Sequence, residues 1–171
     1  MAVKRRIKAS KKNNKQLELI AEFEAAKQQG WISSYEVPAL DKKSCGRFVV
    51  YKPVIDDIVF DSAMEAEYYI YLKSQKYTFD RQVVFELQPA YKLSGKKIAK
   101  IEYIADFVIY DENHTILHVI DVKGRETPEF RIKKKLFEFR YQIPLECIAK
   151  YQNTWMSLSD IRKAKRKTKK R

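Results

Sequence analysis

Cysteine is scarce in this chain, and long apolar runs are missing. The two cysteines, Cys45 and Cys147, lie far apart and outside any CxxC pair. This spacing excludes a cysteine-based zinc site and gives no disulfide framework, so a reducing cytoplasmic environment is expected. No stretch approaches the ~18 apolar residues of a membrane span, and the start, MAVKRRIKASKK, lacks the apolar segment of a secretory signal. We expect neither a membrane partner nor a small-molecule cofactor.

The composition is that of a folded globule. Hydrophobic residues make up 45% of the chain and aromatic residues 13%. With 171 residues the chain has room for one domain with a sizeable core, and is too short for two ordinary ones. We predict a basic N-terminal arm over residues 1–15, a single domain over 16–150 with its core at 61–150, and a basic C-terminal tail over 151–171.

The net charge of +13 is concentrated at the two ends. Residues 1–15 hold seven Lys/Arg and residues 161–171 hold eight, and neither segment contains an acid. The residues between them carry slightly more acidic than basic side chains. A nearly neutral body with two basic ends predicts a polyanionic partner, and nucleic acid is the commonest. A solubilising tail without a specific role is the alternative.

Hydrophobic periodicity predicts a mixed α/β domain. Residues 13–29 fit a helix capped by Asn13 or Asn14 and stopped by Gly30, and the short apolar runs within 31–60 fit strands or a hairpin. The other predicted elements, in chain order, are a helix at 61–75 capped by Asp61 or Ser62, extended chain at 81–93, a turn at 94–97, strands at 98–110 and 116–123, a basic helix from Thr127 to before Pro144, a strand at 144–150 and a short helix in 157–171.

Residues 61–150 therefore run helix, strand, strand, strand, helix, strand. Strands 98–110 and 116–123 are apolar on both faces, as expected in the middle of a sheet that is covered on both sides. This pattern predicts a mixed central sheet flanked by helices.

Charged side chains interrupt these two apolar strands. Asp121 and Lys123 are two residues apart and so leave the same face of their strand, whereas Asp106 sits in the preceding strand. The turn DENHT should make the strands antiparallel neighbours, with Asp106 within one or two rungs of Asp121. Two carboxylates so placed repel each other unless positive charge lies between them. For the pair Asp121 and Lys123 alone, a simple salt bridge is the plainer interpretation.

A divalent cation would neutralise both carboxylates. Asp106, Asp121 and the Val122 carbonyl offer hard oxygen ligands suited to Mg²⁺, with Mn²⁺ as a substitute, and Glu65 in the preceding helix could supply a further carboxylate. Mg²⁺ would polarise a scissile phosphate and acidify a bound water, and Lys123 would hold that water or stabilise the developing charge. His118 has the opposite strand parity to Asp121 and should point away from the site.

An Asp followed by a strand that ends Asp/Glu-x-Lys, in an αβββαβ frame, resembles the PD-(D/E)XK nuclease superfamily. Here the motif reads Ala105-Asp106 and Asp121-Val122-Lys123, with Ala where the superfamily name has Pro. More narrowly, the ordered segments FDSAMEAEYY, FELQPAYKL, IEYIADFVIY, VIDVKG and FRIKKKLFEFRY resemble a family of small phage-encoded proteins sometimes grouped with Holliday-junction resolvases. The resemblance covers residues 50–148.

The resemblance implies a restriction-endonuclease-like αβββαβ core, to which this chain adds an N-terminal helix and basic tails. It implies metal binding by Asp106, Asp121 and the Val122 carbonyl, with Lys123 as the catalytic lysine. It further implies that Glu65 is the helix acid and Gln82 a polar active-site residue. The basic residues expected to face DNA are Arg125, Arg131, Lys133, Lys134, Lys135 and Arg140.

The expected function is that of a Mg²⁺-dependent DNA endonuclease acting in phage recombination or replication, in the host cytoplasm. No base-reading motif is evident, so the expected substrate is branched DNA such as a Holliday junction. Symmetric cutting of two strands favours a homodimer. Two alternatives stay open: a non-catalytic nucleic-acid-binding protein on the same fold, and a nuclease subunit active only with a partner.

Overall fold

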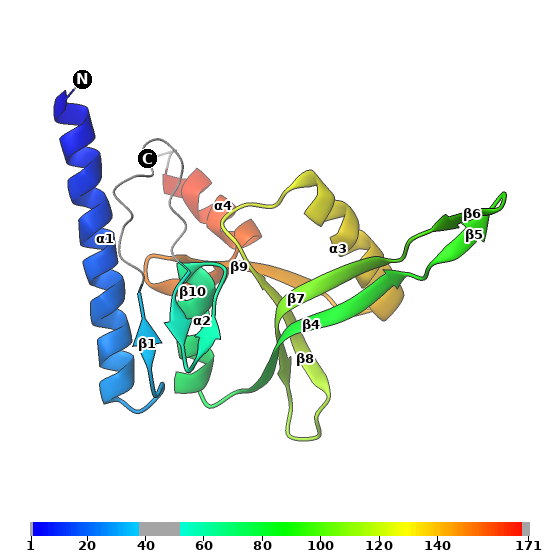
Figure 1. The fold of residues 1–171 in the computed structure, drawn as a ribbon, viewed down its shortest axis with the longest axis horizontal. Helices are drawn as coiled ribbons and strands as arrows, with labels where there is room; N and C mark the ends of the chain where they lie inside the picture. The colour runs from blue at the N-terminus through cyan, green and yellow to red at the C-terminus, as the bar shows by residue number, and fades with distance from the viewer. Residues whose placement is uncertain (1, 38–51, 169–171) are drawn as a thin grey trace. The chain divides into compact units, whose positions relative to one another are not determined.

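The computed structural model describes residues 2–37 and 52–168, and only the backbone of residues 2–13. The chain divides into two compact units, Met1–Lys76 and Tyr77–Arg171, which are described separately below (Figure 1). No helix in the described ranges is long and apolar enough to cross a membrane.

The first unit combines two helices with a small antiparallel sheet in the order β1-β2-β3. Phe23 and Leu72, one from each helix, are fully buried, as are Ile55 and Phe60. The predicted strand in RFVVY, residues 47–51, lies outside the described residues. The elements are α1 (Ala2–Gln28), β1 (Tyr35–Glu36), β2 (Val54–Ile55), β3 (Ile58–Val59) and α2 (Ala63–Ser74).

The N-terminal helix is confirmed, but it is longer than predicted. It begins at Ala2, and no cap at Asn13 or Asn14 interrupts it. Lysine, arginine and alanine are all favourable inside helices, so the basic start of the chain continues the same helix. Gly30 follows its end with φ +72°, a left-handed conformation that glycine adopts without strain.

The second unit contains a five-stranded mixed sheet in the order β10-β9-β8-β7-β4. Neighbouring strands are antiparallel except β8 and β9, which are parallel because α3 connects them. The predicted α/β fold with a mixed central sheet is confirmed. The elements are β4 (Thr78–Gln88), β5 (Tyr91–Leu93), β6 (Lys96–Ile98), β7 (Ile101–Tyr110), β8 (Ile116–Val122), α3 (Pro128–Tyr141), β9 (Leu145–Tyr151), β10 (Thr154–Ser157) and α4 (Leu158–Thr168).

Helix α3 closes part of the core of this unit. Its N-cap is Thr127, whose hydroxyl accepts a hydrogen bond from the Phe130 amide at 3.1 Å, with Pro128 in the first turn as predicted. Phe137 is fully buried and packs edge-on against Phe85 of β4 with ring centroids 4.9 Å apart. These contacts fix α3 against the sheet next to the end of β8.

Strand β10 is absent from the sequence prediction. It pairs with β9 across a two-residue turn in which Gln152 and Asn153 both have positive φ, 49° and 60°. This is the backbone of a tight hairpin, and asparagine tolerates it well. Helix α4 follows directly and buries Leu158 and Ile161. It extends to Thr168, so the basic C-terminal residues up to that point are helical.

Candidate functional site

The paired strands β7 and β8 separate where their acidic residues meet. Their antiparallel register includes Phe107 opposite Ile120, so one further step along each strand brings Asp106 opposite Asp121. This agrees with the predicted juxtaposition. The β7–β8 register ends at Phe107 and Ile120, while β8 continues to pair with β9 as far as Val122.

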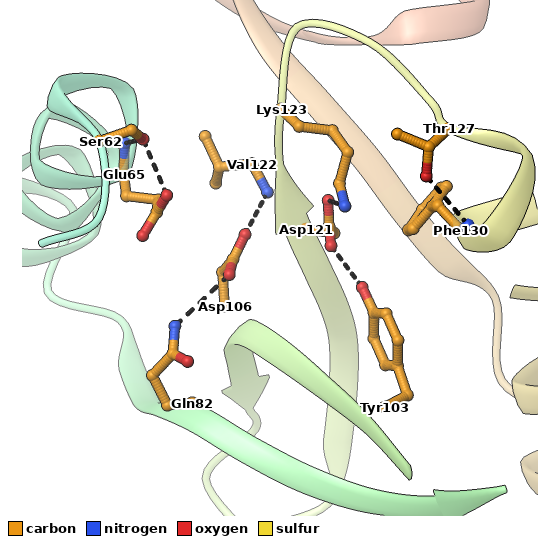
Figure 2. A network of polar contacts seen from close by, with 10 residues as sticks. All are labelled: Ser62, Glu65, Gln82, Tyr103, Asp106, Asp121, Val122, Lys123, Thr127 and Phe130. Atoms are coloured by element: carbon orange, nitrogen blue, oxygen red, sulfur yellow. Dashed lines mark hydrogen bonds and ion pairs between the residues drawn. The ribbon is translucent and has the colours of Figure 1, made fainter. Parts of the chain in front are cut away.

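The Asp106 side chain occupies the place of a ladder partner in this gap. Its Oδ2 accepts the backbone N–H of Val122 at 2.7 Å, and its Oδ1 accepts the Gln82 side-chain amide at 3.4 Å (Figure 2). In an extended strand the N–H and C=O of one residue face the same neighbour. The Val122 carbonyl is therefore directed to the same edge of β8 as its N–H, toward Asp106.

Asp121 is a buried carboxylate, only 3% exposed. Its Oδ1 accepts the Tyr103 hydroxyl at 2.5 Å, and its Oδ2 lies 2.6 Å from Lys123 Nζ without a hydrogen bond of good geometry. Figure 2 shows Tyr103 and Lys123 approaching this carboxylate from opposite ends. A buried charge is stable only when it is compensated in this way. Burial, together with the negative charge nearby, raises the pKa of Tyr103 far above its usual value, so its hydroxyl stays a donor.

Lys123 is held by two further contacts. Its backbone N–H donates to the Ile148 carbonyl of β9 at 3.0 Å, and its ammonium lies 4.0 Å from the centre of the Phe130 ring in α3. A cation over an aromatic face is favourable, the more so when partly desolvated. The lysine is therefore positioned beside Asp121 by both the strand and the following helix.

Gln82 stands out for its backbone. It lies inside β4 between residues paired with Phe107 and Ala105, which places it opposite Asp106, yet its φ is +51°. This left-handed conformation is unfavourable for a residue with a side chain, by about 1–2 kcal/mol. Strain of this kind persists where the surrounding structure imposes it, often at functional sites. The conformation and the amide contact to Asp106 together support the expectation that Gln82 belongs to the site.

Glu65 belongs to the first unit and has a local structural role there. Ser62 is the N-cap of α2, and its hydroxyl accepts the Glu65 N–H at 3.2 Å while donating to Glu65 Oε1 at 2.8 Å (Figure 2). The Ser-x-x-Glu spacing is that of a capping box. Glu65 is nonetheless 9% exposed, an unusual degree of burial for a capping glutamate.

The basic residues of the α3 region differ in how far their charge is already compensated. Lys133 and Lys134 pair with Glu129 and Glu138 one turn away, at 3.1 and 3.6 Å. Arg140 donates to the Leu87 carbonyl and to Glu86 of β4, which links α3 to that strand. The remaining predicted DNA-facing residues, Arg125, Arg131 and Lys135, are exposed.

The donor chemistry of the site fits a hard divalent cation. Two aspartates from neighbouring strands and the Val122 carbonyl are oxygen donors of the kind Mg²⁺ prefers. Over the described residues, no group of three or more His, Cys, Asp or Glu side chains is arranged to hold a metal. A metal here would therefore rely on two carboxylates, the carbonyl and water, a set common for Mg²⁺.

Two residues of this network are not among the sequence predictions, Tyr103 and Phe130. A tyrosine buried in an apolar strand needs a partner for its hydroxyl, and that need is the signal that could have pointed to Tyr103.

Cys147, opposite Asp121 in β9, is buried, and desolvation raises its pKa to about 11. His118 bonds Glu146 at 2.6 Å and takes no part in the network, as expected.

Comparison with known families gives one match. The model for "Protein of unknown function (DUF1064)" matches residues 46–156, nearly two thirds of the chain. The chain belongs to the DUF1064 family. The matched segment contains α2, β4, β7, β8, α3 and β9, and with them Glu65, Gln82, Asp106, Asp121 and Lys123. No curated protein and no solved structure gives a significant match.

Proposed function

We propose that this DUF1064 protein is a divalent-metal-dependent DNA endonuclease of the PD-(D/E)XK type. The observation that carries the proposal is the buried Asp121 carboxylate at the end of β8, with Lys123 at 2.6 Å and Asp106 opposite on β7. A structural salt bridge needs no second acid on the neighbouring strand and no strained glutamine beside it. A hydrolytic site uses all of these groups.

In this proposal each residue has a distinct task. Asp106 and Asp121, with the Val122 carbonyl, would hold Mg²⁺, which would polarise the scissile phosphate and acidify a water. Tyr103 fixes the Asp121 carboxylate through its hydroxyl. Lys123, oriented by the Phe130 ring, donates a hydrogen bond to the attacking water or to the phosphate oxygen on which negative charge grows. Gln82 keeps the Asp106 carboxylate in place.

The proposed substrate is branched DNA, cut in the course of phage recombination or replication. The supporting features are the basic ends of the chain and the lack of a base-reading motif, which favour recognition of backbone and shape over sequence. A homodimer would match the two-fold symmetry of a four-way junction.

The test is cleavage of labelled four-way junction and duplex DNA with Mg²⁺, comparing wild type with Asp121→Asn. We expect at least a 100-fold slower reaction, because the amide cannot replace a charged ligand. Glu112→Gln makes the same chemical change in the exposed turn between β7 and β8 and should cut like wild type. Equal cutting by the Asp121 variant, measured below its melting temperature, would sink the proposal.

A second candidate is a non-catalytic nucleic-acid-binding protein on the same fold. It is favoured by one observation: Lys123 already neutralises Asp121, and no third carboxylate is gathered with the pair in the part of the chain that the structure describes. Calorimetric titration with Mn²⁺ separates the two. Binding that Asp106→Asn and Asp121→Asn abolish supports the nuclease, including one that needs a partner, whereas no binding supports the second candidate.

A further inference from the structure

The hairpin β5–β6 forms a two-stranded sheet of its own, separate from the five-stranded sheet. Figure 1 shows it continuing from the ends of β4 and β7, away from the rest of that unit. Its turn residues Ser94 and Gly95 both have positive φ, 48° and 77°, the backbone of a tight two-residue hairpin. All its strand residues are exposed except Ile98, which is half-buried, so both faces of the hairpin are open.

The two faces of the hairpin differ in chemistry. Lys92 and Lys97 are directly opposite each other on one face, whereas the pairs Tyr91–Ile98 and Leu93–Lys96 alternate with them on the other. Like charges directly opposite each other on a ribbon are destabilising. Such a pair at the exposed surface lowers the stability of the hairpin, unless an anion lies against that face and neutralises the charge.

The hairpin also carries its charge uncompensated. Residues 89–101 contain four lysines and no acid. Lys100 is paired with Glu102 at 2.6 Å. The side chains of Lys92, Lys96 and Lys97 make no ion pair or hydrogen bond within the described residues, in contrast to those of Lys133, Lys134 and Arg140 in α3. The hairpin therefore presents three exposed lysines that no acidic side chain neutralises in the described part of this unit.

We propose that the β5–β6 hairpin enters the major groove of duplex DNA, with Lys92 and Lys97 directed at the phosphates that line it. Strands of a ribbon lie about 4.8 Å apart, and the major groove of B-form DNA, about 12 Å wide, admits a two-stranded ribbon. The groove of A-form RNA is too narrow for side chains to read. This inference rests on the proposed function only in taking DNA as the partner.

The test uses the full chain with Lys92→Ser and Lys97→Ser combined. Binding to a fluorescent duplex is followed by anisotropy without Mg²⁺, over a series of salt concentrations. Removing two phosphate contacts should lower the slope of log affinity against log salt by about 1.8. The matched control, Lys27→Ser with Lys76→Ser, removes the same charge from exposed positions in the first unit and should leave the slope unchanged.

Methylation by dimethyl sulfate reports on the groove, since it modifies guanine N7, which lies there. Wild type should protect guanines that the hairpin variant leaves reactive. Unchanged slope and protection in that variant overturn the hairpin inference and leave the nuclease proposal standing. Hairpin-dependent binding to double-stranded RNA of equal affinity overturns insertion into the groove.

Two other outcomes also count against the inference. Lysines on exposed strands also deter pairing between copies. If the hairpin variant self-associates in sedimentation while its affinity for duplex is unchanged, the role of these lysines is to prevent pairing between copies. If wild type binds no duplex at all, the groove contact is wrong, and cleavage of a four-way junction then decides separately whether the proposed function survives.

Discussion

Gln82 in β4 has a strained backbone and a polar side chain, and substitutions can test the two features separately. Gln82 combines a positive φ with an amide contact to Asp106. Gln82→Gly and Gln82→Ala both remove the amide, but only glycine relieves the backbone. We expect the glycine variant to be more stable than the alanine variant by about 1 kcal/mol in urea unfolding. Both should cleave DNA more slowly than wild type, and equal stability of the two would contradict strain at this position.

At this scale the sequence indicates which charged residues lie close together but not which uncharged residues contact them. Asp106, Asp121 and Lys123 are conspicuous because they interrupt apolar strands. Tyr103 and Phe130 are buried aromatic residues, and their role depends on a hydroxyl and a ring face that each contact a particular charge in space. Hydrophobic periodicity along the chain does not predict such contacts.

Among the elements, helix α2 offers a way to separate a cap from a catalytic acid. Ser62→Ala removes the N-cap and should lower the free energy of unfolding by about 1 kcal/mol. Cleavage below the melting temperature should then be unchanged. Glu65→Gln keeps the size of the side chain and should slow cleavage at least 10-fold if Glu65 is the helix acid of the site. Equal cleavage by the two variants would restrict Glu65 to capping.

The loop after β8 is tied to α4 by an ion pair that titrates. Arg162 donates to Glu126 at 2.8 Å, and this hydrogen bond holds the pKa of Glu126 below its usual 4.5. A carboxyl with a lowered folded-state pKa adds stability above its unfolded pKa, and that stability is lost as pH falls through the folded value. Arg162 is largely exposed, so solvent screening keeps the gain in stability small.

We therefore expect Glu126→Gln to lower the melting temperature at pH 7, with the difference from wild type vanishing in strong acid. Calorimetric scans over the acid range measure this, with Glu112→Gln in an exposed turn as the control. A pH-independent difference would mean that the pair contributes through packing alone.

Element order was largely predictable, and the exceptions have local causes. The helices at α2 and α3 carry Ser and Thr caps, and β7 and β8 are long and apolar, so pattern and propensity agree. Strand β10 is four residues long and follows a Gln-Asn turn that neither glycine nor proline marks. Helix α1 extends to Ala2 through a segment whose charge suggested an arm.

Basic charge is concentrated at the two ends of the chain and in the β5–β6 hairpin. The two ends of the chain hold 15 Lys/Arg, and the uncompensated lysines of β5–β6 add to them. If six or more of them contact DNA, raising salt from 50 to 200 mM should weaken duplex binding by about 10³-fold or more. Anisotropy titrations at each salt concentration measure the slope, and a slope near zero would exclude backbone recognition.

Division of the chain into two units was not foreseen from its length. Composition shows no linker between Lys76 and Tyr77, and three residues, 75–77, separate the end of α2 from β4. Compact units are defined by the contacts within each of them. A single sequence shows the hydrophobic pattern but not those contacts.

The buried thiol of Cys147 makes selective labelling straightforward. A thiol with a pKa of about 11 is almost wholly protonated at neutral pH and reacts slowly with maleimides. With Cys45 replaced by serine, a cysteine introduced at the exposed Ser94 would be the one fast-reacting thiol. A dye at that hairpin tip would give a direct optical signal of where the ribbon goes when DNA is added.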